Sequence, residues 1–317
     1  MTALAACATL LTGCGSGPSQ AGAAAIVGSE AVPLSDTQRA IDEALGQPKL
    51  VENATPSVIS SLAAQEKDSA KYQNLPLEQQ REITRSLFGR IILSRQIQHL
   101  LITEAARREN LSVNPAQVNA ALARQAREVG AIALAFDPAS VREAMEDRLL
   151  TQALAAKYVD RLQITADVMT VNGRANAMKA AHLLAKGGAI AVNTVRAAGP
   201  NGSAGVRMRA AVVAPTGSIF LFGTPANEVV AAYTGGDSYT VWRVTDRRTT
   251  PPPPGSVSIA TVLGSDALYA VGTQLLQPLS EELGVRVNPR YGVWDAPNVM
   301  VLGADQQTSL VLPVDQD

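Results

Sequence analysis

The sequence predicts an α+β protein: a mostly helical N-terminal domain completed by a C-terminal helix and strand, with a small α/β segment inserted between them. Three observations support this class. Helix starts that place a capping residue before a proline recur between residues 35 and 163. After residue 163 the chain becomes rich in glycine and in β-like runs, of which residues 238–245 alternate best. The composition, 46% hydrophobic but only 4% aromatic, predicts an aliphatic core.

The N-terminus predicts an export signal and a lipid anchor. Residues 1–11, MTALAACATLL, are uncharged, and this run is shorter than the roughly 20 residues that span a bilayer but suits a signal peptide. The next residues, Leu11-Thr12-Gly13-Cys14, resemble the lipobox of bacterial lipoproteins, in which a peptidase cuts before a cysteine that carries lipid. The resemblance implies a signal peptide at 1–13, lipid attachment at Cys14 and a flexible tether over 14–25.

Two alternatives to this interpretation stay open. Leu4-Ala5-Ala6-Cys7 also fits a lipobox, although only six residues precede Cys7, and Cys14 can instead be an accidental cysteine in a disordered N-terminus. No Lys or Arg precedes Cys14, which suggests that translation starts upstream of Met1. If Cys14 is lipidated and Cys7 leaves with the signal peptide, the mature chain has no free thiol. Disulfides, thiolate catalysis and cysteine-bound metals are then excluded.

Local signals mark the elements that follow the tether. Residues 23–32 form a β-like run interrupted at Gly28. Ser35 and Gln38 form a capping box for a helix that ends near Gly46.

Further helices complete the first domain. The longest is expected over residues 77–110, and its wide apolar stripe predicts packing against several neighbours. The other helix starts are Thr55-Pro56, Asn114-Pro115 and Asp137-Pro138.

Mixed strand and helix are expected after residue 163. The expected order is a strand at 167–171, a helix at 175–186 ended by Gly187-Gly188, a flexible glycine-rich loop at 199–205 and a strand at 238–245. Four prolines at 251–254 then form a stiff spacer within a linker at 249–255.

The C-terminal segment is too small for a core of its own. A helix is expected from its N-cap Ser265 to Glu282, kinked at Pro278 and closed by Gly284, before strands and turns at 285–314. Because one helix and a strand bury little surface, residues 256–317 are expected to pack on the N-terminal domain.

The order of these parts resembles the N-terminal domain of SurA-type periplasmic chaperones. The resemblance is carried by VGSEAVPLSD at 27–36, by IILSRQIQHLLITEAARRENLSVNPAQVNAAL at 91–122 and by LQITADV at 162–168. It implies a SurA-like helical domain at 26–164, to which a C-terminal helix returns. The alanine- and arginine-rich composition suggests an actinobacterial source.

Residues 165–248 occupy the place where SurA and its Gram-positive relative PrsA carry parvulin-type prolyl isomerase domains. Parvulin sites have one histidine in the first strand and another in the last. Here Met169 and Thr170 stand at the first position, the last strand holds Trp242, and His182 falls in a helix. The segment is therefore expected to be a degenerate parvulin-like insert without catalytic residues.

Other kinds of site find little support. A net charge of −1 offers no basic face to nucleic acid, two histidines are too few for a zinc cluster, and residues 199–205 lack the Lys-Ser/Thr of a phosphate loop. His99 lies at the edge of the apolar stripe and is expected to pack or cap. Glu143, Glu146 and Asp147, among arginines, are expected on a solvated helix face. No cofactor, metal or nucleic-acid partner is expected.

These expectations describe an exported, lipid-anchored, ATP-independent chaperone-like protein on the extracytoplasmic face of a bacterial cell membrane. Its partners would be unfolded or nascent exported proteins, bound in a groove where the N-terminal domain meets the insert, and the membrane through the anchor. A lipid-anchored peptidyl-prolyl cis-trans isomerase and a structural envelope lipoprotein are the alternatives. The missing histidines favour the chaperone over the isomerase.

Overall fold

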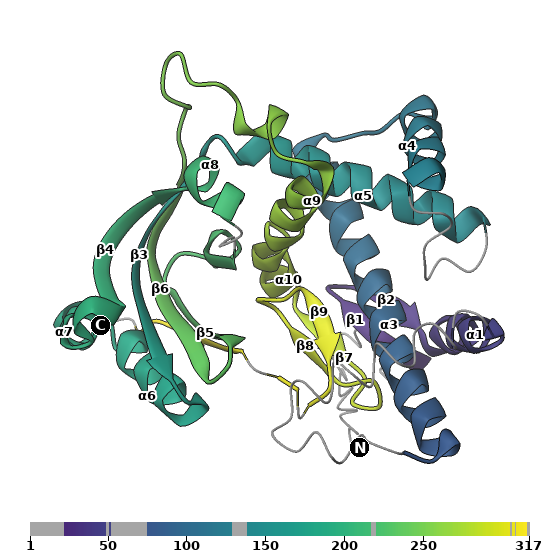
Figure 1. Cartoon of the computed structure of the whole chain (residues 1–317), viewed down its shortest axis with the longest axis horizontal. Helices are drawn as coiled ribbons and strands as arrows, with labels where there is room; N and C mark the ends of the chain where they lie inside the picture. The colour runs from purple at the N-terminus through teal and green to yellow at the C-terminus, as the bar shows by residue number, and fades with distance from the viewer. Residues whose placement is uncertain are drawn as a thin grey trace, which may run out of the picture.

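The computed structural model describes residues 22–48, 51, 75–128, 138–216, 220–304, 306, 307 and 309–315. It confirms the α+β class. A helical part built on one long helix faces a five-stranded sheet, and two C-terminal helices lie between them (Figure 1). Within these residues no helix has the length and apolar character needed to cross a membrane.

A short hairpin opens the helical part. It pairs β1 (Ala23–Val27) with β2 (Glu30–Pro33), turns at Gly28 with φ of 60°, and leads directly into α1 (Leu34–Leu45), which ends at Gly46 as expected. The expected capping box at Ser35 is wrong. Because β2 runs into the helix without a loop, Pro33 is the N-cap and Ser35 lies inside the first turn.

Further helices follow in the described part of the chain, and two of their ends show capping by nearby residues. They are α3 (Leu77–Glu109), α4 (Pro115–Glu128) and α5 (Pro138–Tyr158). Asn110, with φ of 52°, ends α3 in the left-handed conformation. At the start of α4, Asn114 and Gln117 cap each other, each backbone N–H donating to the other's side-chain oxygen at 2.9 Å. The Thr55-Pro56 start and the cap Asp137 lie outside the described residues.

The sheet is antiparallel throughout, in the order β10-β5-β6-β3-β4. Its strands are β3 (Leu162–Asn172), β4 (Gly202–Arg209), β5 (Glu228–Gly235), β6 (Ser238–Thr249) and β10 (Leu310–Pro313). One face packs on α6 (Arg174–Ala185) and α7 (Gly188–Ala197). The other face packs on α8 (Ala210–Val213), η5 (Phe220–Phe222) and α9 (Ser265–Gln274). Three short 3₁₀ turns complete these elements: η3 (Gly199–Asn201), η4 (Ala214–Thr216) and η6 (Ile259–Thr261).

Two details of this segment differ from expectation. The stretch 199–205 is not a loop, because β4 begins at Gly202. Glycine is needed there for close packing on α7, since a Cβ at Gly202 would lie 2.0 Å from the carbonyl oxygen of Val195. In addition, β3 begins at Leu162, so the expected domain boundary at 164 falls inside a strand.

The C-terminal helix is two helices rather than one kinked helix. The first helix, α9, ends at Gln274, and a new helix, α10 (Gln277–Leu283), begins after it. Pro278 lies in the first turn of α10, where a proline costs no helical hydrogen bond. The N-cap of α9 is Gly264 rather than Ser265. Gly284, with φ of 74°, closes α10 as expected.

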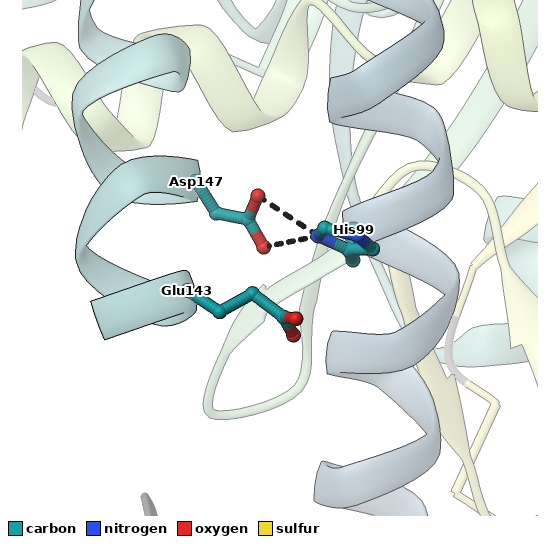
Figure 2. A group of neighbouring side chains, drawn as sticks. All are labelled: His99, Glu143 and Asp147. Atoms are coloured by element: carbon teal, nitrogen blue, oxygen red, sulfur yellow. Dashed lines mark hydrogen bonds and ion pairs between the residues drawn. The ribbon is translucent and has the colours of Figure 1, made fainter. Parts of the chain in front are cut away.

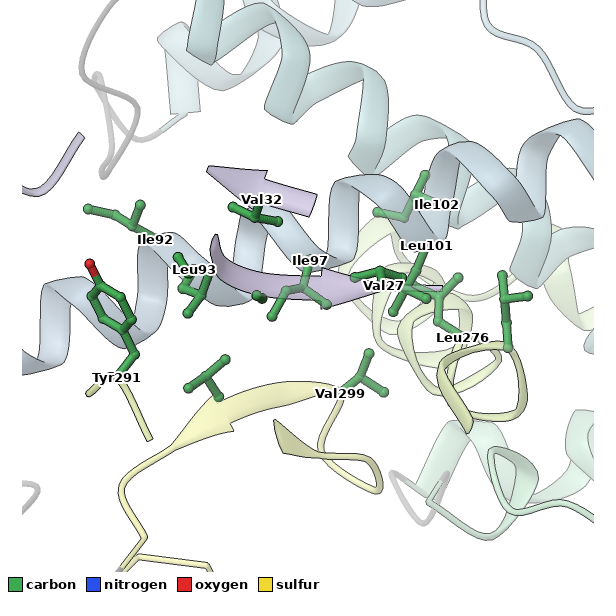
Figure 3. Close-up of a cluster of buried hydrophobic side chains, with 14 of the residues drawn as sticks. Val27, Val32, Ile92, Leu93, Ile97, Leu101, Ile102, Leu276, Tyr291 and Val299 are labelled. Atoms are coloured by element: carbon green, nitrogen blue, oxygen red, sulfur yellow. The ribbon is translucent and has the colours of Figure 1, made fainter. Parts of the chain in front are cut away.

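The C-terminal chain then returns to the N-terminal hairpin. Strand β7 (Val285–Val287) pairs with β1, while β8 (Val293–Asp295) and β9 (Met300–Leu302) form a second hairpin whose β9 packs on α3. The shared core places α3 against Leu276, Tyr291 and Val299 (Figure 3). Leu93 and Ile97 of α3 are fully buried there, which stabilises the fold by about 2 kcal/mol each.

The last strand behaves differently. β10 pairs with β5 and therefore joins the sheet of the inserted segment rather than the N-terminal domain. The chain after residue 256 thus contacts both parts of the molecule.

Candidate functional site

Two of the four residues compared above with a parvulin site are packing residues. Met169 is buried against α6 and α7, whereas Trp242 is buried on the opposite face of the sheet, where its indole N–H donates to the Thr224 hydroxyl at 2.9 Å. Thr170 is exposed near the end of β3, and His182 is exposed on α6. These four side chains do not converge. The predicted lipid site, Cys14, lies outside the described residues.

A buried ion pair fixes this part of the sheet. Asp167 and Arg243 stand opposite each other on β3 and β6, and Arg243 donates to one carboxylate oxygen at 2.5 Å and 3.0 Å. The other oxygen accepts the backbone N–H of Gly205 at 2.8 Å. Both charges are paired, so the pair has a structural role: it joins three neighbouring strands.

Four exposed apolar side chains stand on segments that pack around one buried cluster of the sheet. Val212 on α8, Phe220 on η5, and Val257 and Val262 before α9 are 71%, 38%, 78% and 67% exposed. Their segments pack on the same buried cluster, which also takes Val271 of α9. In Figure 1 the segment between β6 and α9 extends at the same end of the sheet as α8. These four residues are called the apolar rim below, and a partner that covered them would remove their apolar surface from water.

A second candidate lies between α3 and α5. The ring Nδ1 of His99 lies 2.9 Å and 3.0 Å from the two carboxylate oxygens of Asp147, and Glu143 points toward the same place (Figure 2). The hydrogen bond with Asp147 raises the pKa of His99, against the opposing effect of burial. The expected solvated face is thus wrong for Asp147, whose side chain is only 17% exposed and faces α3.

A third polar cluster joins the sheet to α10. Burial, followed by a hydrogen bond with Glu281, raises the pKa of Glu228 on β5 to about 8. The amide of Gln277 donates to Glu281 at 2.9 Å. One oxygen of each of these three side chains is buried without a hydrogen-bond partner. A hydrogen bond between two carboxyls requires one shared proton, and the raised pKa of Glu228 favours its protonated form. Neither glutamate stands out in the sequence, because they are 53 residues apart and meet only in the fold.

Comparison with known proteins returns distant structural matches. No family model and no curated protein matches the chain. Among solved structures, the peptidylprolyl isomerase PrsA from Bacillus anthracis matches with a TM-score of 0.23 and 13% identity, covering 62% of this chain and 99% of that one. The foldase protein PrsA from Lactococcus lactis matches with a TM-score of 0.21 and 13% identity, over 84% of this chain and 95% of that one. Both neighbours are PrsA proteins; the actinobacterial source stays a prediction.

Proposed function

We propose that this protein is a lipid-anchored, ATP-independent chaperone-like protein that binds extended apolar segments of unfolded exported proteins outside the cytoplasmic membrane. The observation that carries the proposal is the apolar rim, with Val212 and Val257 more than 70% exposed. An apolar client side chain buried there gains roughly 1.5–3 kcal/mol, so a few such contacts give reversible binding without a nucleotide. Cys14, by its lipobox, would hold the protein at the membrane.

Prolyl isomerisation is the weaker proposal. An isomerase must lower a barrier of about 20 kcal/mol, and the parvulin pattern uses histidines where this chain has Met169, Thr170 and Trp242. We expect a proline-peptide assay at micromolar protein to give the uncatalysed rate. Acceleration that disappears in His182→Ala would make the isomerase the better proposal.

The chaperone proposal is tested by aggregation of a chemically unfolded substrate without ATP. We expect the purified mature protein to suppress light scattering in a concentration-dependent way. A triple variant with Val212, Val257 and Val262 changed to Ser should lose most of this effect, because all three side chains are exposed and their loss leaves the core intact. Ile190→Ser is the matched control, since Ile190 is 49% exposed on α7, which covers the opposite face of the sheet. Equal suppression by the triple variant would refute the proposed surface.

A further inference from the structure

We propose that His99, Glu143 and Asp147 form a binding site for a divalent transition-metal ion, with Zn²⁺ as the best match, that joins α3 to α5. Each residue offers one ligand atom, and these three atoms lie within 4.8 Å of one another. One imidazole and two carboxylates are a ligand set that Zn²⁺ accepts in proteins. The proposal is independent of client binding.

The backbone supports this arrangement. Glu143 and Asp147 are four residues apart on α5, which places them on one helix face, and His99 approaches from α3 on the other side (Figure 2). Ligand atoms around a tetrahedral zinc ion lie about 2.0–2.2 Å from the metal and hence roughly 3.4 Å from each other. Atoms already within 4.8 Å therefore need only side-chain adjustments of about 1 Å.

The local charge favours a cation. Two carboxylates face one imidazole, and the nearby arginines of α5 are engaged elsewhere. Arg148 pairs with Asp266, while Arg142 donates to Asn119 at 2.6 Å and lies 4.0 Å from Glu146. A neutral His99 leaves the cluster with two negative charges, which a divalent ion balances.

The cluster is also accessible. The His99 side chain is 39% exposed and that of Asp147 is 17% exposed, so an ion can enter from solvent and keep water as its remaining ligand.

The two histidines of the chain make a direct test possible. In proton NMR of the full chain, Zn²⁺ titration should shift the imidazole signals of His99 at one equivalent and leave those of His182 unchanged. His182→Ala is the matched control and should bind Zn²⁺ like the native protein in calorimetry. His99→Ala and Glu143→Gln should each weaken binding by at least about tenfold.

Glu143→Gln keeps the test valid even if His99→Ala misfolds, because Glu143 is exposed and its change leaves the His99–Asp147 pair in place. Three results would overturn the proposal: no heat or spectral change up to millimolar Zn²⁺, equal binding by Glu143→Gln, or loss of binding in His182→Ala. The first of these would leave His99 and Asp147 as an ion pair alone.

Discussion

Glu228→Gln should remove a pH dependence of stability that is built into the junction between the sheet and α10. Glu228 and Glu281 are two carboxyls in one half-buried contact, and burial together with their hydrogen bond raises the pKa of Glu228 to about 8. In the unfolded chain the same carboxyl loses its proton near pH 4.5. Between these values the folded state binds more protons than the unfolded state. The free energy of unfolding therefore falls as pH rises from about 5 to 8.

The size of the effect follows from the shift. At about 1.4 kcal/mol per pKa unit, a shift from 4.5 to about 8 corresponds to ~5 kcal/mol. The carboxyl is only half-buried, and screening by solvent leaves about 2 kcal/mol. A glutamine keeps the hydrogen-bond donor toward Glu281 at every pH and carries no charge. We therefore expect Glu228→Gln to match the native protein at pH 5 and to exceed its stability by about 2 kcal/mol at pH 8.5.

Chemical denaturation at pH 5, 6, 7 and 8.5 measures this difference. His99, whose pKa is raised by Asp147, changes stability in the same direction over this range, and subtracting native from variant values removes its contribution. Glu282→Gln is the matched control, because Arg108 lowers the pKa of Glu282 and its titration falls at acidic pH. A stability difference that is the same at pH 5 and 8.5 would refute the shared proton.

Three further predictions concern the fold and the anchor. Gly272→Ala should lower the free energy of unfolding by about 3 kcal/mol, because its Cβ would lie 2.1 Å from the Thr151 carbonyl oxygen. Gly22→Ala, where the Cβ enters open space, should be nearly neutral in the same denaturation series. Removal of residues 251–317 deletes β7 and uncovers α3, so circular dichroism should show no cooperative unfolding of the remainder; a cooperative helical fragment would contradict this. Cys14→Ser should release the protein from salt-washed membranes, and retention there would refute the anchor.

The parts of the fold that depend on local chemistry could be predicted from the sequence. Asn110 ends α3, and Asn114-Pro115 begins α4. Both could be predicted because capping involves residues only a few positions apart. Ser35 shows the limit of this reasoning. Its capping pattern is sound, but β2 leads straight into α1, so the start of the helix is set by strand pairing.

Tertiary contacts decided the elements that could not be predicted. The glycines at 199–205 suggested a loop, yet Gly202 belongs to β4. Its missing side chain allows β4 to pack closely against Val195 on α7. Similarly, nothing local to residues 310–313 indicates that β10 pairs with β5 instead of the N-terminal strands. Such pairings bring together residues far apart in the chain, and local patterns in a single sequence do not predict them.

The candidate metal site was hidden for a related reason, which lies in α5. The four-residue spacing of Glu143 and Asp147 shows that they share a face, but not what that face meets. Usually the apolar stripe of a helix answers this by marking the buried side. In α5 the buried residues point to three different cores: Met145 toward α4, Leu154 toward α3, and Ala155 toward the sheet. With apolar contacts on three sides, a polar face of α5 can lie against another helix as readily as against solvent. The fold brings His99 to that face.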